Sequence, residues 1–399
     1  MQTLNLVQFD KKLSSDAQLL FGGDFCPIGR YEEKMLSGEE IFHNDLKLLF
    51  KNTFSIINLE APLCEINTPV DSPGGFGLRG DPKIADYLKN IGVDVAGLAN
   101  NHTRDFKSEG VRQTLKNLDK VKILHAGAGE NLEKAEEILE VNINGLKIGI
   151  WALAEKELNV ASKDKGGSSW FNPERNLPIL QQRKEEFDFF IVYLHAGHEF
   201  TSTPSPRIRN ACRAFVDAGA DAVIAHHPHV IQGAEKYKGA LIAYSLGNLV
   251  FDSPYVSAYG KTDEGYMVKI NISEHQINDV EIIPYKLRKN IIVTSLDEME
   301  FEQFTKDFNE LSDNIINDQV FSQEWEKNVR FRYETEYRRI LNDFSKNMND
   351  PGNLDYARRS RNLFASPTHT EMIEKIFLML EEGKIKRMNN ELNKEKNYE

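Results

Sequence analysis

The stretch GVDVAGLANNHTRDF at residues 92–106 is the part of the sequence that decides the predicted fold. Residues 93–99 form a short apolar run, which is typical of a strand buried on both faces. The run ends at the polar triplet Asn-Asn-His, residues 100–102. Segments with helical spacing lie on either side, at residues 81–91 and 108–119. Strand, polar loop and amphipathic helix in succession indicate a layered α/β domain.

Four other apolar runs end in the same way, at residues that can bind metal or substrate. Such residues gather beyond the carboxyl ends of the strands in α/β folds. We therefore expect the five polar clusters to meet at one edge of a sheet. The four runs and the residues that follow them are 18–23 before Asp24, 55–59 before Glu60, 189–194 before His195, and 222–225 before His226, His227 and His229.

The character of the chain changes twice after these motifs. Residues 240–251 and 265–286 alternate in a way that predicts antiparallel strands. Residues 296–345 have helical spacing, which the turn signal Asp-Pro-Gly at 350–352 interrupts. A last helix is predicted from Thr368 to about Glu382, with Ser366 at its N-cap and proline in its first turn.

These segments predict two parts of the chain. The first is an α/β domain over residues 17–295, and the second is a mostly helical extension over residues 296–399. Apolar helical positions in the extension, such as Met372 and Ile376, could pack on the main domain or pair with a second copy of the chain. We favour packing within the chain and keep a homo-oligomer through these helices as the alternative.

Composition excludes several classes of partner. The chain has 399 residues, of which 40% are hydrophobic and 28% charged, as in ordinary globular proteins. A formal net charge of −12 disfavours binding to nucleic acid or to anionic membranes. No stretch approaches the roughly 20 apolar residues of a membrane span. The three cysteines are widely spaced, which is typical of a reducing compartment and predicts a cytoplasmic protein.

The strand-end residues supply the ligands that a pair of metal ions requires. Such a centre needs a bridging carboxylate, several neutral nitrogen or oxygen ligands, and open positions for substrate. In an extended segment residues i and i+2 point the same way, so His227 and His229 can face one site. The full ligand inventory is Asp24, Glu60, Asn101, His102, His195, His227 and His229.

The order of these motifs resembles the CapA/PgsA family of poly-γ-glutamate capsule biosynthesis proteins, whose domain belongs to the calcineurin-like metallophosphoesterase superfamily. The resemblance covers roughly residues 17–290. It implies a metallophosphatase-type α/β sandwich. The stretches that carry it are GGDFCP at 22–27, NLEAPL at 58–63, residues 92–106, HAGHEF at 195–200, AGADAVIAHHPHVIQGAEKYKG at 218–239 and IAYSLGNLVFD at 242–252.

The resemblance implies a role for each motif residue. Asp24 corresponds to the first carboxylate ligand and Glu60 to the bridging carboxylate. Asn101 corresponds to the asparagine ligand, and His102 to the histidine that protonates or stabilises the leaving oxygen. Among the remaining residues, His195 and His227 correspond to ligands of the second metal, His229 to a ligand of the first, and Asp105 to the carboxylate that orients the catalytic histidine.

Two positions depart from the superfamily pattern. Phosphoesterases have Asp-Xaa-His in the first motif, but this chain has Cys26 at the third position. A thiolate ligand there would favour zinc or iron over manganese, although an isolated cysteine is more often simply buried. The second motif carries Glu60 where aspartate is usual. We expect two divalent ions of manganese, iron or zinc, with Cys26 among the candidate ligands.

Four further residues are candidates for substrate binding. His198 and His226 lie beside ligand positions and Glu199 follows His195 by four residues. Arg79, in a glycine-rich loop, could meet an anionic group. Each also has a plainer interpretation as a loop residue or ion-pair partner.

Three functions fit these observations. The first is a metal-dependent hydrolase of a phosphoester or of an amide-bonded polymer, with His102 as general acid. The second is a non-catalytic component of a polyglutamate or capsule assembly system. The third is a binding module that keeps the fold without activity. The substrate or ligand is expected to be an anionic small molecule or polymer.

Overall fold

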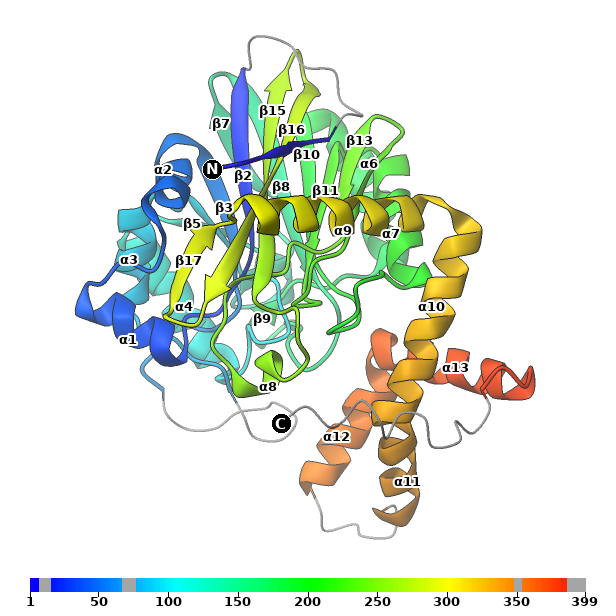
Figure 1. Cartoon of the computed structure of the whole chain (residues 1–399). Helices are drawn as coiled ribbons and strands as arrows, with labels where there is room; N and C mark the ends of the chain where they lie inside the picture. Colours follow the sequence, from blue (N-terminus) through cyan, green and yellow to red (C-terminus); the bar gives the residue numbers. More distant parts are fainter. Residues whose placement is uncertain (7–15, 67–76, 348–353, 386–399) are drawn as a thin grey trace.

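Two β-sheets face each other and helices cover their outer sides (Figure 1). The computed structural model describes residues 1–6, 16–66, 77–347 and 354–385. The predicted fold class, a layered α/β sandwich with a mostly helical C-terminal extension, is confirmed.

The larger sheet has nine strands. Its central strands run parallel, so their carboxyl ends lie at the same edge. In spatial order the strands are β1 (Leu4–Asn5), β16 (Gln276–Arg288), β15 (Glu264–Ser273), β2 (Ala17–Phe25), β3 (Phe54–Leu59), β4 (Val95–Gly97) and β5 (Leu124–Ala126), with β14 (Asn248–Val250) beside β2 and β17 (Ile292–Ser295) beside β16.

The smaller sheet has six strands, of which the four central ones are parallel. Its order is β12 (Ala234–Tyr237), β13 (Ala240–Ala243), β11 (Ala222–His226), β10 (Phe189–His195), β8 (Leu146–Ala154) and β7 (Leu139–Ile143). A separate two-stranded ribbon joins β6 (Ala128–Gly129) to β9 (Gly167–Ser168).

The antiparallel prediction for residues 240–251 is confirmed for one strand pair and fails for two. β13 is antiparallel to β12, but it is parallel to β11, and β14 is parallel to β2 in the other sheet. The chain crosses between the sheets at Gly247, whose φ of +72° suits glycine. All of residues 240–251 are buried. The alternation rule requires one buried and one exposed face, so it could not show how these strands pair. The antiparallel prediction for residues 265–286 is confirmed by the pair β15 and β16.

Apolar side chains from the facing sides of the two sheets form the main core. Phe21 and Ile56 come from the larger sheet, and Ile150, Ile191 and Ile224 come from the smaller one. The Tyr193 hydroxyl donates a 2.7 Å hydrogen bond to the Gly22 carbonyl and so ties the two sheets together. This bond lies two residues from Asp24 and from His195, and it helps to fix the spacing between the two strand ends.

Gly23 allows the close approach of the chain that carries β14. A Cβ atom at residue 23 would lie 2.0 Å from the Gly247 carbonyl oxygen, which is backbone and cannot move aside. We expect Gly23→Ala to lower the free energy of unfolding by about 3 kcal/mol, at the upper end for overpacked cores. Gly22→Ala is the matched control, because its Cβ would mainly meet the flexible end of Leu249 at 2.8 Å. Equal losses of unfolding free energy in urea for the two variants would contradict this account.

Helices cover the outer faces of both sheets. Most contribute apolar residues to the two outer cores, among them Leu46, Leu88 and Leu118 on one side and Leu180 and Phe215 on the other. The larger sheet is covered by α1 (Gly29–Ser37), α2 (Asn44–Asn52), α3 (Ile84–Ile91) and α4 (Lys107–Lys120), and the smaller by α6 (Pro173–Arg183) and α7 (Pro206–Asp217). Short helical segments are α5 (Leu132–Ala135), η1 (Lys184–Glu186) and α8 (Pro254–Ser257).

The C-terminal extension divides into two packing units. Phe304 and Phe308 of its first helix pack into the core between the sheets. The later helices bury Trp325, Met372 and Ile376 in a cluster of their own. The boundary at residue 295 stays a prediction. The elements are α9 (Glu298–Ile316), α10 (Asp318–Arg332), the π-helix η2 (Tyr333–Tyr337), α11 (Arg338–Asn347), α12 (Leu354–Ala365) and α13 (Pro367–Glu381).

An ion pair fastens the start of α9 to β16. Arg288 contacts both carboxylate oxygens of Glu300 at 2.5 and 2.6 Å, and this hydrogen bonding lowers the pKa of Glu300 to about 2. A depressed carboxyl pKa adds stability above pH 4.5, and the gain is lost as the pH falls toward 2. We expect Glu300→Gln to cost about 1 kcal/mol at pH 7 and little at pH 2.5. Glu298→Gln, at an exposed position in the same turn, is the control; equal losses at both pH values would contradict the assignment.

Candidate metal centre

Five strand ends meet and bring two groups of potential metal ligands together. Asp24 is the last residue but one of β2, His195 ends β10, and His226 ends β11. One ligand atom from each of Asp24, His195 and His226 lies within 4.8 Å of the others, and the same holds for Glu60, His227 and His229. All six side chains are buried. Parallel strands deliver these residues to one edge because their carboxyl ends coincide.

Glu60 lies between the two groups. Its Oε1 atom is 3.6 Å from His195 Nε2 and 3.8 Å from His229 Nε2, so one oxygen faces a member of each group. Both carboxylate oxygens are buried, and neither has a hydrogen-bond partner among the residues that the structure describes. Burial, and then the nearby negative charges of Asp24 and Glu199, raise the pKa of Glu60 well above its ordinary value. A divalent cation would supply the positive charge that this carboxylate lacks.

Two histidines of the cluster, His195 and His227, are in the protonation state that metal ligands need. Burial lowers the pKa of His195 well below its ordinary value, and the neighbouring histidines add to this effect. Burial also lowers the pKa of His227 to about 4. Both rings are therefore neutral at pH 7, with nitrogen lone pairs free to bind a cation. On these observations the donor set fits divalent metal ions.

His227 and His229 converge for a different reason than the predicted one. The prediction assumed an extended segment, but the two residues have φ values of +106° and +59°. Such left-handed conformations are costly for side-chain-bearing residues and gather at functional sites. The His227 backbone N–H donates to Asp24 Oδ2 at 3.1 Å, which binds the loop to the first strand end.

An asparagine network, which the sequence did not predict, holds the ligands in place. Asn58 donates to Asp24 Oδ1 at 2.7 Å, and Asn100 donates to Asn58 Oδ1 at 3.1 Å. Asn248 Oδ1 lies 2.9 Å from His229 Nδ1, an arrangement that leaves His229 Nε2 facing Glu60. Asn58 precedes Glu60 by two residues, and this spacing along a strand is the signal that could have identified it.

Asn101 and His102 reach the centre from the loop after β4. The Asn101 amide oxygen lies 3.0 Å from His195 Nε2. His102 Nδ1 lies 2.8 Å from Asp105 Oδ2, as expected for a histidine oriented by a carboxylate. Burial alone would lower the pKa of His102, but the charge and hydrogen bond of Asp105 outweigh it and raise the pKa. Since about a fifth of its side chain (22%) is exposed, His102 remains accessible to a substrate.

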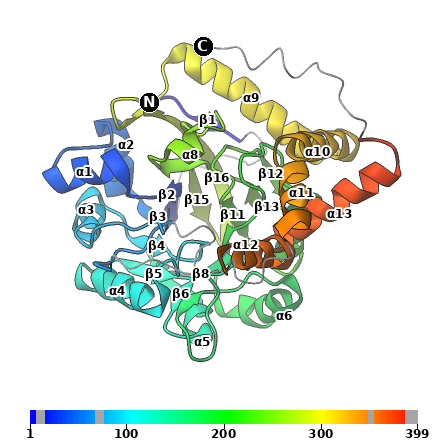
Figure 2. The same ribbon diagram turned by 90° about the horizontal axis from the view of Figure 1, so that it is seen from below.

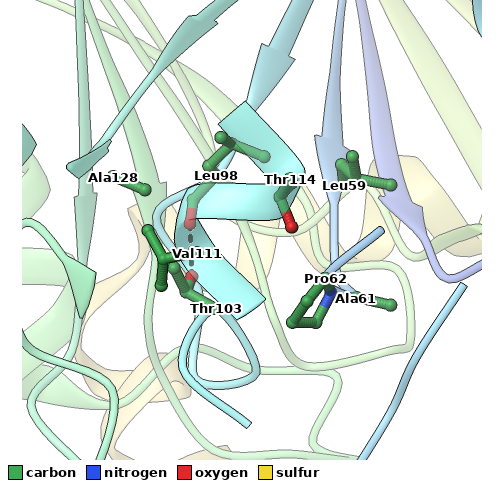
Figure 3. A pocket seen from close by; sticks show the side chains of 8 residues that line it. All are labelled: Leu59, Ala61, Pro62, Leu98, Thr103, Val111, Thr114 and Ala128. Atoms are coloured by element: carbon green, nitrogen blue, oxygen red, sulfur yellow. Dashed lines mark hydrogen bonds between the residues drawn. The ribbon is translucent and has the colours of Figure 1, made fainter. Parts of the chain in front are cut away.

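Thr103 anchors the loop that carries Asn101 and His102. Its hydroxyl donates to the Leu98 carbonyl at the end of β4, the bond drawn in Figure 3. The two residues also line a small, mostly apolar pocket together with Leu59, Ala61, Pro62, Val111, Thr114 and Ala128. This lining contains none of the candidate ligands.

Two predicted site residues have other surroundings. Cys26 lies in a small apolar cluster with Ala61 and Phe251, and it belongs to neither ligand group. Burial raises the pKa of its thiol well above the ordinary value. Arg79 donates to the Cys64 carbonyl at 3.0 Å. Residues 67–76, which include the first part of its glycine-rich loop, lie outside the described residues.

The other three predicted substrate-binding residues surround the ligand groups. His226 Nδ1 lies 2.8 Å from His195 Nδ1 and 3.3 Å from Asp24, so this residue joins the first ligand group. His198 Nε2 contacts Glu371 of the C-terminal extension at 3.2 Å. Burial alone would raise the pKa of Glu199, but the side chains around it, among them His227 and His229, lower it below its ordinary value. Their roles stay predictions.

Fold and site together define a layered α/β protein with a buried carboxylate and histidine centre at the strand ends. The chain belongs to the family of bacterial capsule synthesis proteins named PGA_cap, whose model matches residues 18–253, more than half of the chain.

Two proteins of similar sequence have names that fit this family. The chain is 31% identical to "Capsule biosynthesis protein CapA" of Bacillus anthracis over 55% of each chain. It is 28% identical to "PGA biosynthesis protein CapA" of Bacillus subtilis (strain 168), over 67% of this chain and 71% of that protein. The chain thus spans about half the length of the first of these relatives.

Solved structures are more distant. A 5'-nucleotidase precursor from Thermus thermophilus is 8% identical, with a TM-score of 0.40 over 74% of this chain and 58% of that one. The Thermus thermophilus sulfate thiohydrolase SoxB is 10% identical, with a TM-score of 0.41 over 75% of this chain and 61% of that one. Among the described residues, none of the helices combines the length and apolar character that crossing a bilayer requires.

Proposed function

We propose that the chain is a metal-dependent hydrolase of an anionic substrate, either a phosphoester or a γ-glutamyl amide, that acts in capsule or poly-γ-glutamate metabolism. The observation that supports this proposal is the convergence of two ligand groups on Glu60, whose two buried oxygens have no hydrogen-bond partner within the described residues. The family and the names of the two Bacillus relatives support the biological setting. A cytoplasmic location, which the three unpaired cysteines favour, is part of the proposal.

Each residue of the centre has a role in this proposal. Glu60 would hold metal together with both ligand groups, because its Oε1 faces a member of each. The other residues that would hold metal are Asp24, Asn101, His195, His226, His227 and His229. Bound divalent ions would supply Lewis-acid chemistry and an activated water at neutral pH. Cys26 is left out because its thiol lies in apolar surroundings.

His102 would protonate the leaving group. Asp105 accepts a hydrogen bond from the Nδ1–H group of His102 and so fixes the ring. The Nε2 atom then points away from Asp105 and is free to donate a proton. The raised pKa of His102 keeps a larger fraction of the ring protonated near pH 7, as a general acid requires.

The test is a hydrolysis assay on the full-length chain. The metal-free protein would be loaded in turn with manganese, iron and zinc. It would then be assayed with p-nitrophenyl phosphate, with bis-p-nitrophenyl phosphate and with poly-γ-glutamate. We expect saturable hydrolysis of one substrate class that depends on added metal. Tight metal binding without hydrolysis of any of the three would favour the alternative, a non-catalytic component of a polymer assembly system, which the relatives' names also fit.

A further inference from the structure

A buried carboxylate holds the start of the loop that follows the ligand His195. Glu155 is the residue after β8, which pairs with β10, and it is 4% exposed. Its backbone N–H donates to the His195 carbonyl at 2.9 Å, and its Oε2 accepts from the Gly197 N–H at 3.1 Å. Glu155 therefore fixes both ends of a three-residue segment that begins at a candidate metal ligand.

The same loop, residues 196–200, connects the two ligand groups. The Ala196 N–H donates to the His226 carbonyl at 3.1 Å, and the Phe200 N–H donates to the Pro228 carbonyl at 2.8 Å. Pro228 stands between the two histidines of the second ligand group. The conformation of the loop 196–200 therefore affects the position of ligands in both groups.

The backbone of this loop needs support from its surroundings. Gly197 has a φ of +121° and Phe200 a φ of +59°. A left-handed conformation is costly for a residue that carries a side chain, and it persists only where neighbouring contacts fix it. Glu155 supplies such a contact at Gly197. The carboxylate of Glu155 is in turn held by the C-terminal extension.

Thr368, in the first turn of α13, makes this contact. Its hydroxyl donates to Glu155 Oε2 at 2.7 Å and accepts from Arg207 Nη2 at 2.9 Å. It also lies 3.1 Å from the Gly197 carbonyl oxygen. Arg207 Nη2 lies 2.6 Å from the other oxygen of Glu155. Figure 2 shows α11, α12 and α13 on one side of the two sheets. A side chain of the extension thus contacts both Glu155 and the loop that Glu155 holds.

Glu371 makes a second attachment one turn further along α13. Its carboxylate accepts from the backbone N–H of Arg207 at 3.1 Å and from the Nε–H at 3.2 Å. The same carboxylate lies 3.2 Å from His198 Nε2. The ring of His198 lies 5.0 Å from the ring of Trp325 in α10. Two helices of the extension therefore contact the loop 196–200.

We propose that the C-terminal extension is part of the metal centre, and that Thr368 is a positioning residue that holds the loop 196–200 in the conformation that binds metal. Glu155 transmits the contact, because its Oε2 accepts from both Thr368 and Gly197. Removing a partner that orients metal ligands typically weakens metal binding. The inference rests on the proposed function only in assigning divalent ions to the two ligand groups. It gives a role to a part of the chain outside residues 18–253, which the family model matches.

Metal affinity tests the proposal without turnover. Full-length wild type, Thr368→Val and Thr368→Ser would be titrated with zinc and with manganese in competition with a chromophoric chelator. We expect Thr368→Val to weaken metal binding by about 10-fold, because valine removes the hydroxyl. Thr368→Ser keeps the hydroxyl and should restore most of the affinity. Thr370→Val is the matched control, because Thr370 is exposed on the same helix and its hydroxyl donates to the Ser366 carbonyl within the extension.

Hydrogen exchange tests the reciprocal effect. If attachment of the extension favours metal binding, bound metal must favour attachment by the same factor. Amide exchange in α13 of wild type should therefore slow on zinc binding, by up to about 10-fold. The effect should be smaller in Thr368→Val. Exchange in α2, which packs on the outer face of the larger sheet, is the internal control and should change less than exchange in α13.

Equal metal affinity of wild type and Thr368→Val overturns the inference. This holds even where the variant is less stable, because Thr368 would then have a structural role only. Unchanged exchange in α13 on metal binding overturns it as well. If Thr368→Val does not fold, Glu371→Gln takes its place, with the exposed Glu374→Gln as its control. Wild-type metal affinity in Glu371→Gln would then overturn the inference.

Failure of this inference and failure of the proposed function are distinguishable. Thr368-dependent metal binding in a protein without hydrolytic activity supports the inference while the hydrolase function fails. Metal-dependent hydrolysis with an affinity for metal that does not depend on Thr368 overturns the inference alone. A wild-type protein that binds no metal overturns the inference and the metal centre together.

Discussion

Glutamine at position 60 is expected to make the metal-free protein more stable and to remove most of the stabilisation that metal confers. Glu60 is fully buried, has no hydrogen-bond partner in the described part of the chain, and lies beside Asp24. Because its pKa is raised in the folded state, the ionised carboxylate destabilises the metal-free fold above pH 4.5. We expect Glu60→Gln to raise the free energy of unfolding of the metal-free protein by about 2 kcal/mol.

With metal bound, wild type should instead be more stable than Glu60→Gln. A ligand at 100 times its Kd stabilises the native state by about 2.7 kcal/mol, and Glu60→Gln should lose nearly all of this gain. Thermal unfolding with increasing manganese or zinc measures both effects. The matched control is Glu235→Gln, because Glu235 is buried but bound by both arms of Arg213 at 2.8 Å. That variant should lose about 3 kcal/mol whether or not metal is present. A metal-free Glu60→Gln protein that is less stable than wild type would contradict this account of Glu60.

Replacing His102 by glutamine should give the largest loss of turnover. A positioned general acid typically contributes about 100- to 10,000-fold, and we expect kcat to fall within this range while metal content stays unchanged. Asp105→Asn should cost about 10- to 100-fold, because Asp105 only orients the ring.

His125 provides the control for this prediction. His125 also pairs with an aspartate, Asp119, at 3.1 Å, but it belongs to neither ligand group among the described residues. Unchanged turnover is expected for His125→Gln. A His102→Gln protein with wild-type kcat on the substrate that shows metal-dependent hydrolysis would exclude His102 as the general acid.

Much of the fold was predictable from local patterns in the sequence. Short apolar runs that end in polar residues identify parallel strands, since a strand buried on both faces has no polar residues until it ends. The five runs form the central strands of the two sheets, and the helices predicted at residues 81–91 and 108–119 correspond to α3 and α4. The crossing from β13 to β14 was not predictable, because every residue from 240 to 251 is buried and the alternation rule requires one exposed face.

The site was predictable only where ligands follow strand ends directly. Cys26 follows Asp24 by two residues, and in a strand it would point to the same side as Asp24. β2 ends at Phe25, however, so the alternation of side chains along the strand does not extend to Cys26. The sequence also offered no signal for the contacts of Thr368 and Glu371. Both lie on a helix whose spacing shows which face is apolar, but not which residues of another domain its side chains will meet. Such contacts depend on tertiary packing between segments that are far apart in the sequence.

The apolar residues of the last helix illustrate the same limit. Met372 and Ile376 pack within the extension, whereas Phe377 and Leu380 remain 50% and 38% exposed. Packing within the chain, the favoured interpretation, therefore accounts for one face of α13. A homo-oligomer through the other face stays a prediction.

The most direct test of the central claim is the metal content of the full-length chain, purified without chelator and measured by elemental analysis. The two ligand groups around Glu60 predict two equivalents of manganese, iron or zinc per chain, falling to one or none in Glu60→Gln. A protein that holds no metal, even after soaking in excess of each ion and removal of the unbound excess, would contradict the account of this site.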